Sequence, residues 1–361
     1  MPAELTARPA RNESSPLRPP SWRGSRRRVA FSGALCLLLA ACTTNPTTGR
    51  SQFATMSAAE ERALGEQAAP QLTEEFGGEV SNSELRAYVN EVGSKLKDQT
   101  EVDGPQRAWA FTLLDSDVIN AFALPGEKVF ISRGLADKMT NEAQLAGVLG
   151  HEIGHVMARH SNERMSQATW VGILAAGAGA VAGAAVQDPT LGQALPALAT
   201  QGGQLVVLKF SREQESEADT LGMRYMSKAG YNPRGQLEVM QILKREAGGG
   251  SPPEFLATHP LPDTRIREIE QSLAKDYAAT QNQPDKYGMF PERFQQRYLS
   301  VSSNMPKKKQ PTPKAKGKNA AADDLSPRPR LLADLMRGDP TQWCAVCRDR
   351  ATATATSPLL P

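Results

Sequence analysis

The spacing of hydrophobic positions predicts where the chain is helical. Residues 57–100 carry apolar side chains at the spacing of one helix face. These positions are Leu64, Ala68, Leu72, Leu85, Tyr88, Val89, Val92 and Leu96. Ser57 followed three residues later by Glu60 is typical of a capping box, so we expect helical structure to begin there.

Three short segments after residue 108 predict strands rather than helices. Residues 109–114 favour an extended conformation. Residues 118–123 and 128–132 follow, and the sequence Leu-Pro-Gly-Glu between them is a turn signal. We expect either residues 120–123 or residues 128–132 to form an exposed edge strand.

Later segments return to helical patterning. One helix is expected to begin near Asn141 and to continue beyond His160. A second extends from about Lys209 to Ala229, before Gly230, and a third follows Asp263, which we interpret as its N-cap. These patterns predict an α+β chain that is mainly helical with a small β-sheet.

The first 42 residues have the pattern of an export signal. A polar, basic stretch at 1–28 precedes an apolar run at 29–41, which is too short for a stable membrane span. The run ends in Leu-Ala-Ala followed by Cys42, which resembles a bacterial lipobox, so we expect Cys42 to carry a lipid anchor. Thr43 in place of Asp resembles Gram-negative lipoproteins of the outer membrane. The alternative is an ordinary signal peptide with an incidental cysteine.

Charge and composition divide the remaining chain. Residues 1–41 carry a net charge of +5, residues 302–361 carry +6, and the middle of the chain carries −8. A negatively charged body does not favour nucleic-acid binding. We expect a signal peptide at 1–41, an extended tether at 42–56, a peptidase domain at 57–301, and a disordered basic and Pro-rich tail at 302–361.

Two further segments allow alternatives. Residues 168–186 are nearly all small and apolar, and they predict either close-packed helices or a mobile flap, or alternatively a membrane span or re-entrant element. The tail contains Cys344-Ala-Val-Cys347, where one C-x-x-C without a second pair is a weak signal for zinc or redox chemistry. In an oxidising compartment a local disulfide, or no bond, is the simpler interpretation.

The segment His151-Glu152-Ile153-Gly154-His155 carries the main indication of chemistry. Two histidines four residues apart on one helix face can bind one metal ion, and Glu152 beside them can take a proton from water. Apolar residues around the motif turn this helix towards a core, where such polar groups are costly without a metal. A surface helix with solvated histidines is the alternative. We read His160 as structural or exposed, because five helical residues turn it about 140° from His155.

A third protein ligand must come from elsewhere, since a hydrolytic zinc site usually has three. The acidic segment at 211–219 offers Glu213, Glu215, Glu217 and Asp219. Glu215 and Asp219 share one helix face, so one can bind the metal while the other fixes a histidine ligand through its free ring N–H. Spacing alone does not choose among these glutamates, and a solvated acidic face is the alternative.

Three motifs taken together resemble the zinc metalloprotease family of the CAAX prenyl proteases, HtpX and the periplasmic BepA-type proteases. They are HEIGHVMARH at 151–160, SREQESEADTLG at 211–222 and HPLPDTRI at 259–266. Residues 45–53 and 118–135 also resemble the bacterial lipoprotein branch of that family. The resemblance implies a mainly helical, gluzincin-like zincin with its sheet beside the H-E-x-x-H helix. It covers residues 45–275.

The resemblance assigns roles to individual residues. It implies one zinc ion per chain, bound by His151, His155 and Glu215. Asp219 would not bind the metal but would hold one of its ligands in place. It places His259 near the metal, where it either stabilises the transition state or reversibly blocks the zinc. The helical-repeat module of BepA-type proteins is not evident here.

The expected function is zinc-dependent proteolysis in the periplasm, with Glu152 as general base. Substrates would be unfolded or misassembled envelope proteins that add a strand to the edge of the sheet. Asn120 would touch the substrate backbone, or simply satisfy a strand end, and Arg212 is a second candidate for binding substrate or the oxyanion. The competing functions are a chaperone with a silenced zinc site and a zinc amidase for cell-wall peptides.

Overall fold

The computed structural model describes residues 42–101, 103–169, 209–249, 252–260 and 263–306. The chain divides into two units, Met1–Thr43 and Thr44–Pro361, and the following concerns the second. The expected signal peptide, most of the apolar stretch at 168–186, and the tail from 307 with its C-x-x-C lie outside the described residues. Among the helices that are described, none combines the length and apolar character that crossing a membrane requires.

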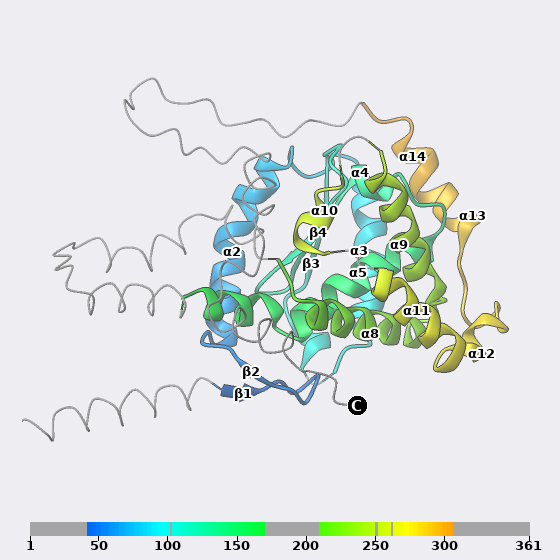
Figure 1. The fold of residues 1–361 in the computed structure, drawn as a ribbon. Helices are drawn as coiled ribbons and strands as arrows, with labels where there is room; N and C mark the ends of the chain where they lie inside the picture. Colours follow the sequence, from blue (N-terminus) through cyan, green and yellow to red (C-terminus); the bar gives the residue numbers. More distant parts are fainter. Residues whose placement is uncertain (1–41, 102, 170–208, 250–251, 261–262, 307–361) are drawn as a thin grey trace, which may run out of the picture. The chain divides into compact units, whose positions relative to one another are not determined.

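Helices make up most of the described structure (Figure 1). The longer ones are α2 (Ala58–Glu75), α3 (Ser83–Lys97), α5 (Glu142–Met157), α8 (Arg212–Lys228), α9 (Arg234–Ala247) and α11 (Asp263–Lys275). The shorter ones are α4 (Arg133–Ala136), α10 (Phe255–Thr258), α12 (Ala278–Gln281), α13 (Pro291–Phe294) and α14 (Ser300–Ser302), with a 3-10 turn at Gly104–Gln106 and a π-helical turn at Gln295–Leu299. The predicted capping box at Ser57 is confirmed, and the expected mainly helical α+β fold is confirmed.

A small sheet lies beside α5. Its strands β3 (Ala110–Leu114), β4 (Ala121–Leu124) and β5 (Lys128–Ser132) have the order β3–β5–β4. Strand β5 is parallel to β3 and antiparallel to β4. Of the two candidates for an edge strand, residues 120–123 correspond to β4, which lies at an edge of this sheet, whereas residues 128–132 form the central strand β5. The short strands β1 (Cys42–Thr44) and β2 (Ser51–Phe53) precede α2.

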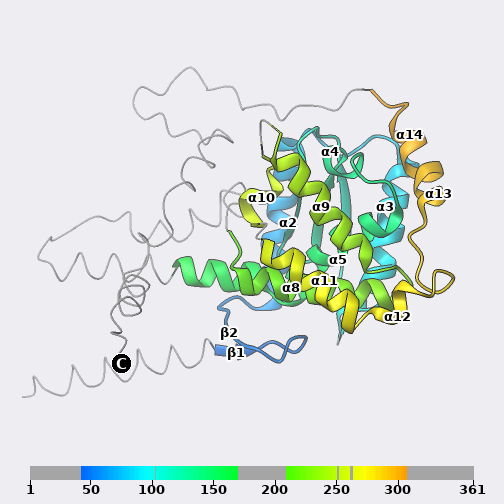
Figure 2. The same cartoon turned by 45° about the vertical axis from the view of Figure 1, so that its right-hand side comes forward.

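Helix α5 carries the H-E-x-x-H motif through the middle of the fold (Figure 2). Every residue of this helix except Val156 is buried, and it packs against α3, α8, α9 and the sheet. Glycines on its surface allow α8 to approach closely. A Cβ atom added to Gly154 would lie 2.8 Å from the carbonyl oxygen of Ala218, and one added to Gly150 would lie 3.3 Å from Cα of Gly222. Close approach of the two backbones sets the distance between the histidines of α5 and the acidic residues of α8.

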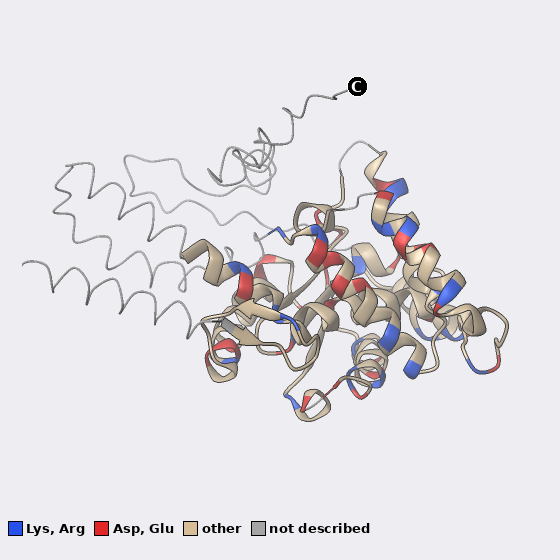
Figure 3. Cartoon of the chain, turned by 60° about the horizontal axis from the view of Figure 1, so that its bottom comes forward, with Lys and Arg blue, Asp and Glu red and all other residues tan. Residues whose placement is uncertain are grey.

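The amino end of α5 is fixed by a buried carboxylate. Glu142 accepts hydrogen bonds from the hydroxyls of Tyr88 (2.6 Å) and Tyr231 (2.7 Å) and forms an ion pair with Arg293. A negative charge at this end also complements the helix dipole. Figure 3 shows acidic and basic residues interspersed along the outer helices.

Helix α5 ends earlier than the sequence pattern predicted. It stops at Met157, and Arg159 has a left-handed backbone with φ of 56° before residues 160–169 become helical again. The expectation of one helix running beyond His160 was therefore wrong. The break changes the direction of the chain between His155 and His160.

Residues 45–56 belong to the segment 42–56 that was expected to be an extended tether, and they contact the helical body at this break. The side-chain amide of Asn45 donates to the carbonyl oxygen of Met157 (3.0 Å), at the carboxyl end of α5. The backbone of Thr55 donates to Ser166 (2.9 Å), and the carbonyl oxygen of Met56 accepts from Asn162 (2.8 Å). The segment therefore belongs structurally to the surroundings of α5.

Candidate metal centre

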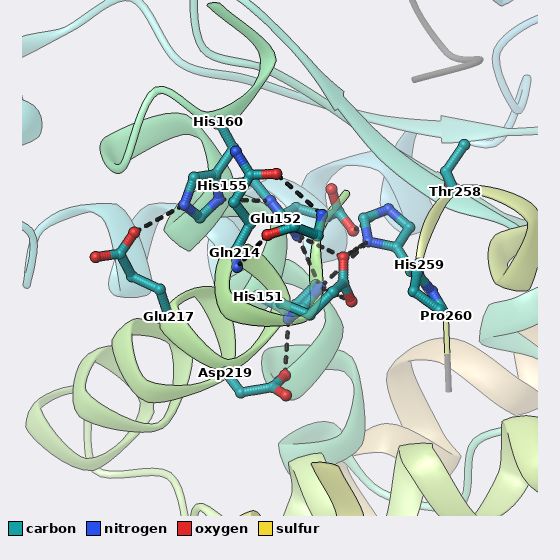
Figure 4. A network of polar contacts seen from close by, with 12 residues as sticks. His151, Glu152, His155, His160, Gln214, Glu217, Asp219, Thr258, His259 and Pro260 are labelled. Atoms are coloured by element: carbon teal, nitrogen blue, oxygen red, sulfur yellow. Dashed lines mark hydrogen bonds and ion pairs between the residues drawn. The ribbon is translucent and has the colours of Figure 1, made fainter. Parts of the chain in front are cut away.

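Four buried side chains from three segments converge at the carboxyl half of α5 (Figure 4). His151 and His155 come from α5, Glu215 from the first half of α8, and His259 from the residue after α10. Each offers one donor atom, and the four atoms lie within 4.8 Å of one another. All four residues are at most 3% exposed.

The distances among these atoms fit a single small cation. The Nε2 atoms of His151 and His155 are 3.0 Å apart, and Glu215 oxygens lie 3.6 Å and 3.4 Å from them. Nδ1 of His259 lies 3.0 Å from Glu215 Oε1 and 3.4 Å from His151 Nε2. Tetrahedral ligands at the zinc distances found in proteins are separated by about 3.3 Å. The donor set, with imidazole and carboxylate, is also the kind that zinc binds.

A hydrogen bond from Nδ1 of His151 to Asp219 leaves a lone pair on the other ring nitrogen, Nε2. Nδ1 of His151 lies 2.9 Å from Oδ1 of Asp219, and an ionised carboxylate can only accept. The ring proton is therefore on Nδ1, and Nε2 presents a lone pair to the other donors. Asp219 is kept ionised: burial alone would raise its pKa, but Arg265 and His151 hold the pKa well below its usual range.

Arg265 is a member of the site that the sequence analysis did not single out. Its guanidinium is 1% exposed and donates to both oxygens of Asp219 at 2.7 Å, to Glu215, and to the carbonyl oxygen of Pro260 at 3.0 Å. Burial raises the pKa of Glu215, but His259 and Arg265 outweigh it and leave that pKa well below its ordinary value. The available signal was an arginine six residues after His259, in the same quoted motif.

Glu152 lies beside the donors without a partner of its own. It is fully buried, and neither carboxylate oxygen has a hydrogen bond to any described residue. The nearest charged contact is Nε2 of His259, 3.7 Å from Oε1. Burial raises the pKa of Glu152 above its ordinary value. A carboxylate with a raised pKa and no fixed partner is suited to taking up and releasing a proton.

The expectation that His160 points away from His155 was wrong, whereas its interpretation as a structural residue agrees with its burial. Its Nδ1 lies 2.8 Å from Nδ1 of His155, and its Nε2 lies 2.9 Å from Oε2 of Glu217 (Figure 4). The residue is completely buried. The reason is the left-handed residue Arg159, which interrupts the helix and turns His160 back towards the motif.

The other residues predicted for the site are placed differently. Asn120 is buried at 3% exposure, its backbone pairs with Ser132, and its side-chain oxygen has no partner among the described residues. Arg212 and Glu213, in the first turn of α8, are exposed, and within the described ranges Arg212 has no hydrogen bond to the four donors. Cys42 lies in β1.

Comparison with known proteins gives one family and several named relatives. Residues 83–273 match the model of peptidase family M48. The chain is 32% identical over 230 residues to the beta-barrel assembly-enhancing protease of Yersinia pestis, covering 62% of this chain and 46% of that protein. The Escherichia coli K12 protein of the same name is 31% identical over 232 residues, with the same shares.

The match to a mitochondrial relative spans a larger share of that relative's length. The mitochondrial metalloendopeptidase OMA1 of Schizosaccharomyces pombe is 32% identical over 232 residues, which is 63% of this chain and 65% of that protein. By contrast, the match spans less than half the length of the two bacterial relatives. All three matches agree with the resemblance inferred from the three motifs.

Proposed function

The chain belongs to peptidase family M48, and from that premise we propose that it is a zinc-dependent endopeptidase of the bacterial cell envelope. The observation that carries the proposal is Glu152, a buried carboxylate that lies beside four converging donors and has no hydrogen-bond partner in the described part of the chain. Burying a carboxylate of this kind is costly unless a cation or a hydrogen-bond partner compensates its charge. Family membership and geometry thus support the same chemistry.

The residues divide into ligands and supports. His151, His155 and Glu215 would hold the zinc ion, and Asp219 would orient His151 through its ring N–H. When bound, zinc supplies Lewis acidity towards the scissile carbonyl and towards a water molecule. Arg265 holds Glu215 and Asp219 in register, because one guanidinium bonds both carboxylates.

Glu152 is the proposed general base and acid. Its carboxylate accepts a proton from the attacking water and later returns that proton to the leaving amine. Burial favours this role, because a pKa above the ordinary value makes the carboxylate a better acceptor of a proton. The absence of a fixed hydrogen bond among the described residues leaves both oxygens available to the reactants.

His259 is the proposed control of the site. Its Nδ1 stands among the donor atoms at 3.0 Å from Glu215, where a fourth protein ligand would exclude water and substrate. Its ring is stacked on Phe255 with centroids 4.4 Å apart, so α10 holds it there. We propose that this is a latched arrangement, and that displaced His259 stabilises the developing oxyanion.

The proposed substrates are unfolded or misassembled envelope proteins. Strand β4 lies at an edge of its sheet, and an extended chain could add to it through backbone hydrogen bonds, with little demand on sequence. The unpartnered oxygen of Asn120, just before β4, supports contact with a substrate amide. Arg212 is exposed at the start of α8 and remains a candidate for a more peripheral substrate contact.

The proposed location is the periplasm, with a lipid on Cys42 anchoring the protein to the outer membrane. The support is the basic, apolar and small-residue pattern that ends at this cysteine. Relatives named beta-barrel assembly-enhancing protease support a role of this protease in the assembly of beta-barrel proteins, and we propose quality control of such proteins as its purpose. A lipid anchor would keep the peptidase near newly exported outer-membrane proteins.

The deciding experiment measures zinc content and casein cleavage for the full chain and for Glu152→Gln. We expect one zinc per chain in both proteins and cleavage by the wild type alone, because the amide keeps the shape but cannot take the proton. Cleavage by Glu152→Gln would contradict the general-base assignment. An absence of zinc from both would overturn the metal centre itself.

A second candidate function follows from the position of His259. If both proteins contain zinc and neither cleaves casein, the wild type is either latched or a chaperone that holds unfolded proteins. Cleavage by His259→Ala would identify a latched peptidase even though this variant also lacks the proposed oxyanion stabiliser, because a chaperone has no cleavage to release. Cleavage of cell-wall peptides but not casein would instead indicate the zinc amidase.

A further inference from the structure

We propose that His160 is a positioning residue for the metal centre: it fixes the proton and the ring orientation of His155, and it is itself fixed by Glu217 and Arg50. The inference rests on the proposed zinc site but not on proteolysis. Figure 4 shows the three groups in line, with Glu217 reaching His160 and His160 reaching His155.

The protons in this line can be counted from the outer end. An ionised Glu217 can only accept, so the Nε2 of His160, 2.9 Å away, carries a proton. A neutral His160 then has a lone pair on Nδ1, which accepts the Nδ1–H of His155 across 2.8 Å. His155 is left with its lone pair on Nε2, the atom that lies among the donors. The relay therefore selects the tautomer that a metal ligand requires.

The outer end of the relay is held by an arginine from the amino-terminal segment. Arg50 Nε lies 3.4 Å from Glu217, and its two terminal nitrogens bond Glu163 at 2.9 Å and 2.8 Å. Gln214 also donates to Glu163, at 2.9 Å. The bidentate pair between Arg50 and Glu163 has a defined geometry, so it holds in place the guanidinium whose Nε faces Glu217. Residues 45–56 thus contribute to the surroundings of a metal ligand.

The imidazole of His155 also faces Glu215 (3.4 Å) and His151 (3.0 Å) through Nε2, on the side of the donor atoms. One face stacks on Phe210, with ring centroids 4.0 Å apart and planes at 29°. Stacking restrains the plane of the ring but does not distinguish its two nitrogens. His160 supplies the hydrogen bond at Nδ1, as Asp219 does for His151. Such partners of metal-binding histidines affect metal affinity because they set ligand orientation and basicity.

The first test measures the zinc dissociation constant of the full chain by chelator competition. We expect His160→Leu to weaken zinc binding by about 10–100-fold, the range found for such partners. His160→Asn should recover part of this loss, because an amide oxygen at the place of Nδ1 can still accept from His155. Ser166→Ala is the matched control, since Ser166 is equally buried in the same helical segment but bonds Thr55 and Asn162 instead.

These variants separate a positioning role from simple packing. If Ser166→Ala weakens zinc binding as much as His160→Leu, or if His160→Asn recovers nothing, the proposal is overturned. If His160→Leu binds zinc more weakly than the wild type and His160→Asn recovers part of that loss, the proposal stands even when no protein cleaves casein. That last combination would count against the proposed peptidase function alone.

The second test observes the protons directly. The chain has four histidines, and all of them belong to this site. Long-range proton–nitrogen NMR spectra of zinc-loaded full chain labelled with ¹⁵N-histidine should show His155 protonated at Nδ1 and His160 protonated at Nε2. Glu217→Leu should remove the preference of His160 for that form. A doubly protonated His160, or one protonated at Nδ1 in the wild type, would refute the relay.

Discussion

The two histidines of α5 receive the same proton arrangement from different surroundings. His151 donates a hydrogen bond directly to the carboxylate of Asp219, which also accepts hydrogen bonds from Gln236 (2.7 Å) and Arg265. His155 is bonded by another imidazole, and the carboxylate comes one step later, at Glu217. The first arrangement is built from core helices, whereas the second is completed by a segment that precedes the first long helix.

The charged side chains on the two sides also differ in how far they are exposed to solvent. The side chains of Arg265 and Asp219 are 2% and 6% exposed, whereas those of Arg50 and Glu217 are 37% and 23% exposed. Removing one partner of a buried pair leaves an uncompensated charge, but an exposed pair is solvated and contributes little. The comparison therefore predicts that changes on the His151 side damage both folding and zinc binding. Changes on the His155 side should mainly affect zinc binding.

The largest effect is expected for Arg265→Leu. This change leaves the carboxylates of Asp219 and Glu215 buried without the guanidinium that neutralises them, which lowers the free energy of unfolding by about 3–5 kcal/mol. The measurement is urea unfolding of the full chain. Arg267→Leu is the matched control, because Arg267 lies on the same helix but is exposed. Equal unfolding midpoints for the two variants would contradict the view that Arg265 stabilises the fold by neutralising Asp219 and Glu215.

An intermediate effect is expected for Asp219→Asn. The amide oxygen can still accept the His151 ring proton, but the charge that strengthens this bond is lost, so zinc affinity should fall by about 10–100-fold. The comparison with His160→Asn is informative, since each variant keeps a hydrogen-bond acceptor for the Nδ1–H of one proposed metal ligand, His151 or His155. We expect Asp219→Asn also to lower the unfolding free energy, and His160→Asn to change it less. The reverse order of stabilities would break the distinction between the two sides.

The difference between the two sides also explains what could be predicted from sequence. Helix periodicity placed His151, Glu152 and His155 correctly relative to one another, because all three lie in the single regular helix α5. The acidic residues of α8 were recognised as a group because all four lie close together in the sequence, within residues 213–219. The three strands were found within a few residues of their observed bounds.

The remaining parts of the site depend on interruptions and tertiary contacts. His160 was misplaced because one left-handed residue, Arg159, ends the helical period, and a non-glycine residue gives no local signal for this conformation. Arg265 and Arg50 were missed as partners because their carboxylates are 46 or more residues away in the chain. Long-range pairs of this kind leave no periodic pattern in the sequence.

The smallest effect is expected for Arg50→Leu, which tests the outer end of the His155 relay. Arg50 is more than one-third exposed, so its ion pairs contribute only about 1 kcal/mol to folding even with bidentate geometry. Zinc affinity should fall less than in His160→Leu, because Glu217 can still accept from His160. Arg86→Leu is the control, since Arg86 forms a similarly exposed ion pair with Glu79 away from the relay.

The pH dependence of this small difference has a defined sign. Burial raises the pKa of Glu163, but hydrogen bonds from Arg50 and Gln214 outweigh it and hold the pKa below the ordinary value of 4.5. A carboxyl group with a lowered pKa in the folded state stabilises the fold above its ordinary pKa, and this contribution is lost as the pH falls through its folded pKa. The difference in unfolding free energy between wild type and Arg50→Leu should therefore be full at neutral pH and shrink progressively below pH 4.5. A constant difference from neutral to acidic pH would show that Arg50 acts through packing of its aliphatic stem and not through its charge.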